Sequence, residues 1–392
     1  MIKIFFPLIF IFGLISCKSS TESVDYMGQM QPDSIPMIFA PDIVSIKGRL
    51  EHGLSFSPDT RELAFGILNK DDFSGKIYYS KKVYANWTEP TVFETLKNEC
   101  VYLPYFSPNG KSLLYAQSKP DTANGYTDIW MVERINNDWG SPKILQTPIS
   151  STSREANACM TKDGTIYFSS NRNCEGKENC HTADLFYSKL VDNEYQSANV
   201  ISEFISSNDE ESVFISPTQD YILFCRYTDN ETWMDLYISY RDINNNWIEP
   251  QMVDSTINSK DWDRRPFVSI DNKFLFFTRL QKGEKGLTES DIYWVNTSKL
   301  FKPFVFKPIP AKTIKIGKEI KLSIPTDYFK DIDNENLEIN LNHEMFDWAK
   351  FDNEQMTLTM YPNEIGEFDL IFTAVDEFSN VMENKVKIIV EE

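Results

Sequence analysis

Four acidic residues recur at matching places along the sequence, and the chemistry they could do is the first question. Glu51, Glu155, Glu210 and Asp263 each stand five residues before a segment that is repeated with variations, and Val101 occupies the remaining matching place. Two carboxylates facing one pocket can cleave a glycosidic bond, one as acid and the other as base or nucleophile. Such carboxylates can also bind a ligand or a cation, or they can form a solvated rim that caps strand starts. All three interpretations are open at this point.

Other residues that could do chemistry are few. The three histidines, His52, His181 and His343, are scattered, and the sequence has no Gly-x-Ser-x-Gly, His-Glu-x-x-His, Walker or dinucleotide-binding motif. A serine hydrolase is therefore poorly supported, and the sequence leaves enzyme activity undecided while favouring its absence. Five arginines near predicted strand ends could pair with the four acids and make them structural: Arg172, Arg226, Arg264, Arg265 and Arg279.

The repeated segments define the elements that must position these residues. "FSPDTRELAF" begins at Phe56, and its relatives begin at Phe106, Met160, Ile215 and Val268, at spacings of 50, 54, 55 and 53 residues. A period in this range indicates a repeat architecture. Each of the first four repeats contains four short strand patterns. The fourth often carries a proline, as at Pro90, Pro142 and Pro250, which suits an outer edge strand. The four acids fall at the starts of the innermost strands.

Four antiparallel strands per repeat predict an all-β, five-bladed β-propeller. The fifth repeat has no clear fourth strand, whereas "APDIV" within residues 38–46 resembles the fourth strands of the other repeats. We therefore expect an N-terminal strand to complete the last blade and close the ring. A sixth, degenerate blade within residues 18–50 is the alternative.

The segments "FSPDTRELAF" and "FSPNGKSLLY", the latter followed by "DIW", resemble the TolB-type, WD40-like propeller repeat. The resemblance covers roughly residues 38–305, within a predicted propeller domain of residues 34–306. That family contains partner-binding envelope proteins, and similar propellers occur fused to hydrolases. The resemblance is specific for the fold and much less so for the function.

Short alternating strands in residues 307–392 predict a β-sandwich after the propeller. The order "DYFKDIDNENLEI…GEFDLIFTAVDEFSN" resembles cadherin-like, immunoglobulin-type modules of exported bacterial proteins. In such modules acidic residues can bind Ca²⁺, a hard ion that takes several oxygen ligands. The resemblance places these ligands at Asp331, Asp333 and Asp376, with a solvated acidic loop as the alternative. Calcium is the only cofactor implied.

The N-terminus predicts export and a lipid anchor. Lys3 precedes an apolar stretch of twelve residues from Ile4 to Ile15, which is too short to span a bilayer. The following Ser16-Cys17 resembles a bacterial lipobox, so residues 1–17 would be a lipoprotein signal with lipid on Cys17. Lys18 at the second mature position resembles an outer-membrane sorting signal, and residues 18–33 form a polar tether.

Export would place the other cysteines in an oxidising compartment. Cys174 and Cys180 flank "EGKEN" in one loop, which favours a local disulfide. Free thiols, or a metal site that includes His181, are the alternatives, and two cysteines with one histidine make a weak zinc signal. The remaining cysteines lie in or beside strand patterns and are expected to be buried.

The net charge of −19 argues against a nucleic-acid ligand. Two hypotheses about function remain. The first is a non-catalytic lipoprotein of the outer membrane, attached to the membrane only through its lipid, whose propeller binds an envelope protein or a glycan. The second is a glycan-active hydrolase that uses Glu51, Glu155, Glu210 or Asp263 at the channel mouth.

Overall fold

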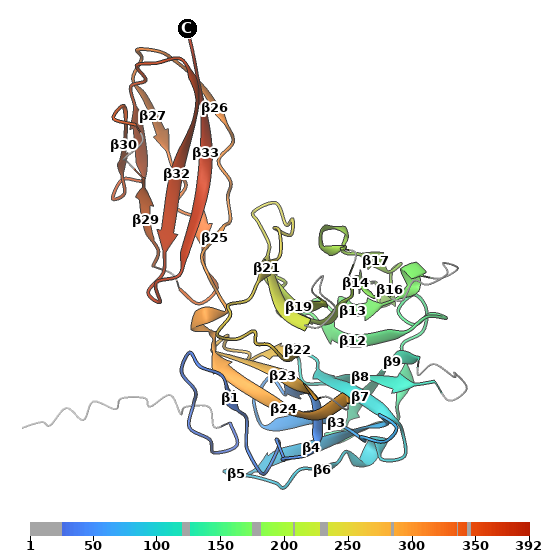
Figure 1. The fold of residues 1–392 in the computed structure, drawn as a ribbon. Coiled ribbons are helices and arrows are strands. Elements are labelled where there is room, and N and C mark those ends of the chain that lie inside the picture. Colours follow the sequence, from blue (N-terminus) through green and yellow to red (C-terminus); the bar gives the residue numbers. More distant parts are fainter. Residues whose placement is uncertain are drawn as a thin grey trace, which may run out of the picture.

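The structure is a computed structural model of the chain. It describes residues 26–119, 126–174, 182–206, 208–227, 234–283, 286–334, 336–342 and 346–392, except for the side chains of residues 282–287. Strands and a few short 3-10 turns make up its regular structure. The predicted all-β propeller fold is confirmed, and the sandwich stands beside it on one side (Figure 1). In the described part of the chain, no helix is long and apolar enough to cross a membrane.

One four-stranded antiparallel unit occurs five times in the described residues, and each innermost strand pairs with the next strand along the chain. Alternation of large apolar and small or polar residues explains these strands, because successive side chains face opposite sides of a sheet. The first unit contains β2 (Leu50–Phe56), β3 (Glu62–Leu68), β4 (Gly75–Val83) and β6 (Thr91–Val92), and the second contains β7 (Val101–Phe106), β8 (Ser112–Ser118), β9 (Thr127–Ile135) and β11 (Lys143–Ile144). The third unit contains β12 (Glu155–Met160), β13 (Ile166–Ser170), β14 (Asp184–Ser188) and β17 (Asn199–Val200), and the fourth contains β18 (Glu210–Ile215), β19 (Tyr221–Tyr227), β20 (Met234–Tyr240) and β21 (Gln251–Met252). The fifth unit contains β22 (Trp262–Val268), β23 (Phe274–Gly283), β24 (Gly286–Asn296) and the N-terminal β1 (Met37–Ile38).

The hairpin between the first two strands of a unit explains the repeated "SPNG" type of segment. The Ser107 hydroxyl donates to Asn109 Oδ1 at 2.8 Å and accepts from the Ser112 backbone N–H at 2.9 Å. Gly110 has φ of +66°, a left-handed conformation that glycine adopts without steric cost. The same turn is built from Ser57, Ser216 and Ser269 in three other units.

The N-terminal segment closes the ring, as the sequence predicts. Strand β1 pairs with β24 in the last unit, and the Phe39 N–H donates to the Ile292 carbonyl at 2.8 Å. The strand lies slightly earlier than the sequence suggests. "APDIV" forms a turn instead, because Ala40 and Asp42 have positive φ and the Val44 N–H bonds back to Ala40.

The tail domain is the expected β-sandwich of two sheets. One consists of β26 (Lys312–Lys315), β33 (Val381–Glu391), β32 (Gly366–Val375) and β29 (Glu338–Leu341), and the other of β27 (Ile320–Ser323), β31 (Thr357–Met360) and β30 (Ala349–Asp352). Their inner faces bury a core that includes Tyr328, Leu358, Phe372 and Ile388. Strand β25 (Phe304–Val305), just after the last blade, pairs with β28 (Phe329–Lys330) and joins the two domains.

Phe39→Ala should destabilise the propeller by roughly 3–5 kcal/mol, the usual cost of deleting a buried phenylalanine ring. The Phe39 ring is fully buried and packs 5.1 Å from Phe276 and 5.4 Å from Trp294, so its loss detaches the closing segment. The neighbouring Ile38 is 37% exposed, and Ile38→Ala is the control, expected to cost under about 1 kcal/mol. Thermal unfolding of both variants measures this, and equal melting temperatures would show that the packing of Phe39 does not stabilise the closed ring.

Candidate functional site

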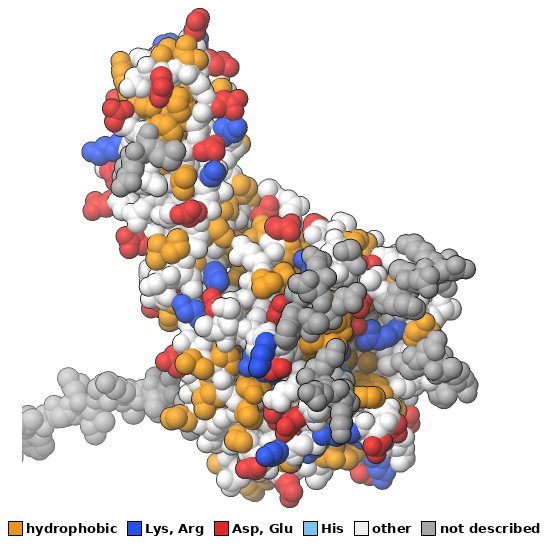
Figure 2. All heavy atoms as spheres, viewed as in Figure 1, with side chains coloured by type: hydrophobic (Ala, Val, Ile, Leu, Met, Phe, Trp, Pro, Cys, Tyr) orange, Lys and Arg blue, Asp and Glu red, His pale blue; other side chains and the backbone are white. Residues whose placement is uncertain are grey.

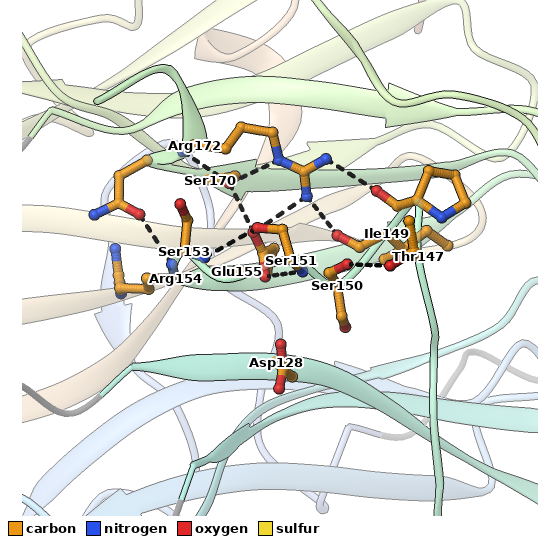
Figure 3. A network of polar contacts seen from close by, with 12 residues as sticks. Asp128, Thr147, Ile149, Ser150, Ser151, Ser153, Arg154, Glu155, Ser170 and Arg172 are labelled. Atoms are coloured by element: carbon orange, nitrogen blue, oxygen red, sulfur yellow. Dashed lines mark hydrogen bonds and ion pairs between the residues drawn. The ribbon is translucent and has the colours of Figure 1, made fainter. Parts of the chain in front are cut away.

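The four recurring acids do not line an open mouth. Glu51, Glu155, Glu210 and Asp263 are all fully buried at the starts of their strands. Figure 3 shows Glu155 at the centre of a polar network. Its carboxylate accepts from the Ser151 N–H at 2.9 Å, the Ser170 hydroxyl at 3.0 Å and the Arg172 guanidinium at 3.1 Å. The same guanidinium donates to the Ile149 carbonyl at 2.5 Å, so the network fixes the loop that leads into β12.

The same network recurs in the next two units. Each acid accepts from a serine four residues earlier and from an arginine on the second strand, and that arginine also donates to a carbonyl of the preceding loop. The arginine nitrogen lies 2.8 Å from the acid oxygen in the fourth unit and 2.7 Å in the fifth. The two sets are Glu210, Ser206 and Arg226, and Asp263, Ser259 and Arg279.

The first unit satisfies the same position differently, and the second unit has Val101 there instead of an acid. Glu51 pairs with Arg49, two residues earlier, at 2.6 Å. Burial raises the pKa of Glu51 to about 7, although Arg49 opposes the shift. Burial also raises the pKa values of Glu210 and Asp263, again against their arginines. A ligand-binding role for the four acids stays a prediction, but each carboxylate already has a structural partner.

Each innermost strand bulges shortly after the acid position. The register with the second strand shifts in all five units, at residues with positive φ. Such backbone is costly for residues other than glycine and concentrates at functional sites, and bulges re-aim side chains. The five residues are Gly53, Leu103, Asn157, Ser212 and Arg265, and together they line a central cavity of about 40 Å³. They therefore mark the channel where the five units meet.

A cluster of charged side chains gathers at this level of the channel. Arg264 and Arg265 lie in the β22 bulge, with His52 on β2 and Glu211 on β18, and all four are at most 9% exposed. Arg154, just before β12, donates to Glu211 at 2.6 Å and has a side chain that is 29% exposed. We call these five residues the arginine cluster. Its most exposed member, Arg154, marks the side on which the cluster reaches solvent.

The two buried arginines have different surroundings. Arg265 donates to Asn157 Oδ1 and Ser212 Oγ, both at 2.6 Å, and lies 3.6 Å from Glu211. In the described part of the chain, the Arg264 guanidinium has no ion-pair partner, and its nearest polar contact is His52 Nδ1 at 3.5 Å. The Nε atoms of both arginines are buried without a hydrogen-bond partner. Glu211 attracts Arg264 from beyond ion-pair distance, so Arg264 is a buried cation without a direct ion-pair partner among the described residues.

The pKa values within the cluster reflect this crowding of positive charge. Burial would raise the pKa of Glu211, but Arg154 and Arg265 outweigh it and lower the pKa to about 2. Burial lowers the pKa of His52 well below its usual value, and the nearby arginines add to the effect, so the imidazole is neutral at pH 7. Burial, with a contribution from Arg265, lowers the pKa of Arg264 to about 10, so it stays charged.

The opposite end of the channel is apolar and filled. Tyr105, Phe214 and Phe267 come from three different blades, and Tyr26 from the N-terminal segment lies beside them around a cavity of about 30 Å³. A cavity of this size holds about one or two water molecules. This end of the channel is therefore closed by side chains of the described residues.

Sequence reasoning found part of this site. Pairing of Arg172, Arg226 and Arg279 with the repeated acids is correct, whereas Arg264 and Arg265 lie in the channel and do not pair with those acids. His52, Arg154 and Glu211 were not foreseen as a group. The sequence does contain a signal for them, because each stands directly before or after one of the four acids. The bulged strands bring these neighbouring positions together at the channel.

The three predicted calcium ligands lie near the junction of the two domains. Asp331 Oδ2 and Asp333 Oδ1 are buried without hydrogen-bond partners, whereas Asp376 is occupied by the Phe378 and Asn380 N–H groups and the Asn380 amide. No group of three or more His, Cys, Asp and Glu side chains could hold a metal ion within the described ranges. The three aspartates thus do not form one ligand set, and calcium binding stays a prediction.

The structure describes four of the six cysteines, Cys100, Cys159, Cys174 and Cys225. Cys174 is disulfide-bonded, but its expected partner Cys180, together with His181, lies outside the described residues, so this pairing stays a prediction. Cys159 and Cys225 are buried free thiols, as expected, whereas Cys100 is half-buried. Cys17 also lies outside the described residues.

Comparisons with known proteins give only distant likenesses. No protein-family model matches the chain, and no curated protein matches its sequence. A protein of Agrobacterium tumefaciens provisionally assigned as a TolB is similar in structure, with 11% identity, a TM-score of 0.41 and coverage of 92% of this chain and 91% of that one. The catalytic domain of a Coprinopsis cinerea GH62 α-L-arabinofuranosidase has 7% identity, a TM-score of 0.43 and coverage of 68% and 98%. A Dyadobacter fermentans protein of unknown function has 12% identity, a TM-score of 0.40 and coverage of 68% and 83%. No activity or ligand is transferred from likenesses this distant.

Arg279→Gln and Arg264→Gln should have opposite effects on stability. Arg279→Gln leaves the fully buried Asp263 without its cation, which should cost roughly 3–5 kcal/mol of unfolding free energy. Arg264→Gln removes a cation that has no ion-pair partner among the described residues, so stability should be unchanged or higher. Chemical denaturation of the two variants measures the difference. An equally large loss for Arg264→Gln would show that this arginine has a structural role.

Asp331 should make the stability of the tail domain depend on pH. Burial, followed by the charge of Asp333, raises the pKa of Asp331 to about 7 in the folded protein. The folded state then binds a proton that the unfolded state releases near pH 4, so stability should fall as pH rises from about 4 through about 7. Melting temperatures between pH 5 and pH 8 should decline less in Asp331→Asn, with the exposed Asp347→Asn as control.

Added Ca²⁺ gives this experiment a second readout. If the ion binds the two carboxylates, it should raise the melting temperature above pH 7 in the wild type and less in Asp331→Asn. An identical pH profile for wild type and Asp331→Asn would contradict the assignment of the pH dependence to this residue.

Proposed function

We propose that the chain is a non-catalytic binding platform of the bacterial cell envelope, which binds a protein or a glycan at the channel mouth beside the arginine cluster. One observation carries the proposal: the Arg264 guanidinium is buried with no ion-pair partner among the described residues. Burying an unpaired charge costs folding free energy. A bound ligand group would offset that cost, as happens at sites shaped for function rather than for stability.

A hydrolase is the second candidate, and one observation favours it. Asp209 and Glu211 both lie near Arg154, and their pKa values are shifted in opposite directions, with burial raising that of Asp209. Such divergence is typical of acid and base pairs. However, Asp209 accepts the Ala183 N–H at 2.5 Å and Glu211 is paired with Arg154 at 2.6 Å. Both carboxylates are therefore engaged, which favours binding over catalysis.

The envelope location rests on the N-terminal sequence. Residues 1–17 resemble a lipoprotein signal, and lipid on Cys17 would hold the protein at the outer membrane through the tether of residues 18–33. Acidic side chains are scattered over both domains on the face seen in Figure 2. Such a surface suits a soluble body held next to a membrane rather than one that binds nucleic acid.

The proposal is tested by comparing binding with hydrolysis in the full-length protein. Wild-type protein should capture a component of envelope extract and release no reducing sugar from a panel of envelope and plant polysaccharides. Arg264→Gln should weaken capture. Asp209→Asn and Glu211→Gln should release as little reducing sugar as the wild type. Polysaccharide cleavage that disappears in Asp209→Asn or Glu211→Gln would establish the hydrolase instead.

The same cells test the anchor. Wild-type protein should remain with the membranes after a high-salt wash, and Cys17→Ser should appear in the soluble fraction. Membrane retention of the serine variant would refute the lipid anchor without affecting the ligand site.

A further inference from the structure

We propose that a hollow between the third and fourth units (green and yellow in Figure 1) binds a neutral oligosaccharide. The hollow has a volume of about 820 Å³, which lies in the range of small-molecule sites. Its walls come from the turn ends of the two units and from the domain junction, where Phe306 and Lys330 contribute. The arginine cluster lies at the other ends of the innermost strands β12 and β18. The inference is therefore independent of that site and goes beyond the proposed function.

A chain of hydrogen bonds that alternates between the two units lines the hollow. Gln219, in the fourth unit, donates to Asp163 Oδ2 and accepts from the Tyr167 hydroxyl, both at 2.9 Å and both in the third unit. The Tyr167 hydroxyl also accepts from the Arg241 guanidinium of the fourth unit at 3.2 Å. That guanidinium lies 4.1 Å from the ring centre of Trp247. Because these side chains are already held in place, little further ordering opposes the binding of a ligand.

Tyr187 gives the hollow an aromatic surface. Its ring is half-buried and packs against the Tyr167 ring, with 5.7 Å between the ring centres and 28° between the ring planes. The face of an aromatic ring carries a negative electrostatic potential, which attracts the C–H groups on the face of a sugar ring. The nearby Lys189 ammonium lies 6.0 Å from the Tyr187 ring centre on an exposed side chain, so it can move aside for a ligand.

Polar groups around the rim supply both donors and acceptors. Lys189 and Lys330 line the hollow and form no ion pair with described residues. Glu203 accepts a hydrogen bond from the Ser202 hydroxyl at 3.1 Å, and Asp220 accepts one from the Thr218 hydroxyl. A carboxylate has further lone pairs, and each hydroxyl of a sugar both donates and accepts. A ring of sugar hydroxyls therefore matches this rim.

The charges around the hollow nearly cancel. Three basic side chains, Lys189, Arg241 and Lys330, face four acidic ones, so the formal net charge of the lining is −1. Of the acids, Asp163 and Asp242 already accept N–H groups of their own turns. Neither an anion nor a cation finds a strong excess of opposite charge here, so the lining favours a neutral ligand.

The lining suits a sugar better than a peptide. An extended peptide adds to a row of free backbone groups at a sheet edge, and an amphipathic helix needs an apolar groove. The outer strand beside the hollow, β17, is only two residues long. Most of the lining side chains are charged or polar. Neither mode of peptide binding therefore fits the hollow.

Calorimetric titration of the full-length protein tests the inference. The probes are neutral trisaccharides, namely maltotriose, cellotriose, mannotriose, galactotriose and xylotriose. Sorbitol, which has hydroxyls but no ring, and trigalacturonate, which is acidic, are the controls. At least one neutral trisaccharide should bind with a Kd below about 1 mM. Both controls should bind at least tenfold more weakly than the best neutral sugar.

Variants assign the binding to the hollow. Tyr187→Ala removes the aromatic surface and should weaken binding at least tenfold. Tyr293→Ala is the matched control, because Tyr293 is also half-buried, packs against Phe277 of the neighbouring strand at 6.0 Å and lies outside the hollow; it should leave the Kd within twofold. Ser202→Trp, at an exposed position of the lining, should abolish binding by filling the hollow. Ser197→Trp, exposed outside the hollow, should not.

Three outcomes would overturn the inference. The first is that none of the neutral trisaccharides binds. The second is binding that survives Tyr187→Ala and Ser202→Trp but is lost in Arg264→Gln, which would place the sugar at the arginine cluster and leave the proposed function intact. The third is capture of an envelope protein that is lost in Ser202→Trp and is not displaced by any trisaccharide, which would make the hollow a protein-docking surface.

Discussion

The buried pair between an acid at the start of an innermost strand and an arginine on or just after the next strand is the constraint on which the channel depends. Glu155 and Arg172 show it most fully, since the pair also binds Ser151 and the Ile149 carbonyl. Charges buried this completely must be paired. In each unit that has such a pair, it holds the loop before the innermost strand against the second strand. The innermost strands of these units therefore start at the same level along the channel axis.

That fixed starting point gives the bulges their effect. Because the strand is held at the acid and again by the serine turn at its far end, the extra residue can only project toward the channel axis. In the fifth unit, the pair formed by Asp263 and Arg279 holds the strand directly before Arg264 and Arg265. The structural network thus places two guanidinium groups in the channel, and one of them has no carboxylate partner among the described residues. Asp263, which forms a stabilising ion pair, and Arg264, which has no direct ion-pair partner among the described residues, are adjacent in the chain.

The two ends of the channel differ in chemistry for a related reason. At the far end, side chains of the strand ends and the N-terminal Tyr26 meet as packed aromatic rings, and the Tyr105 hydroxyl donates to the Met160 carbonyl. Closure by the N-terminal segment therefore does more than complete a sheet, because it also fills this end of the channel.

The sequence by itself determined the repeat, the strand order within it, the turn chemistry, the ring closure and the sandwich, because period, alternation and turn residues are local properties. It also identified the acids at the strand starts and three of the arginines that pair with them. It did not determine that Glu51, Glu155, Glu210 and Asp263 are buried rather than displayed around a mouth. Nor did it bring His52, Arg154, Glu211 and Arg264 together, since they come from four different units. Only the tertiary structure decided these points, because burial and the direction of a side chain after a bulge depend on how the units close around one axis.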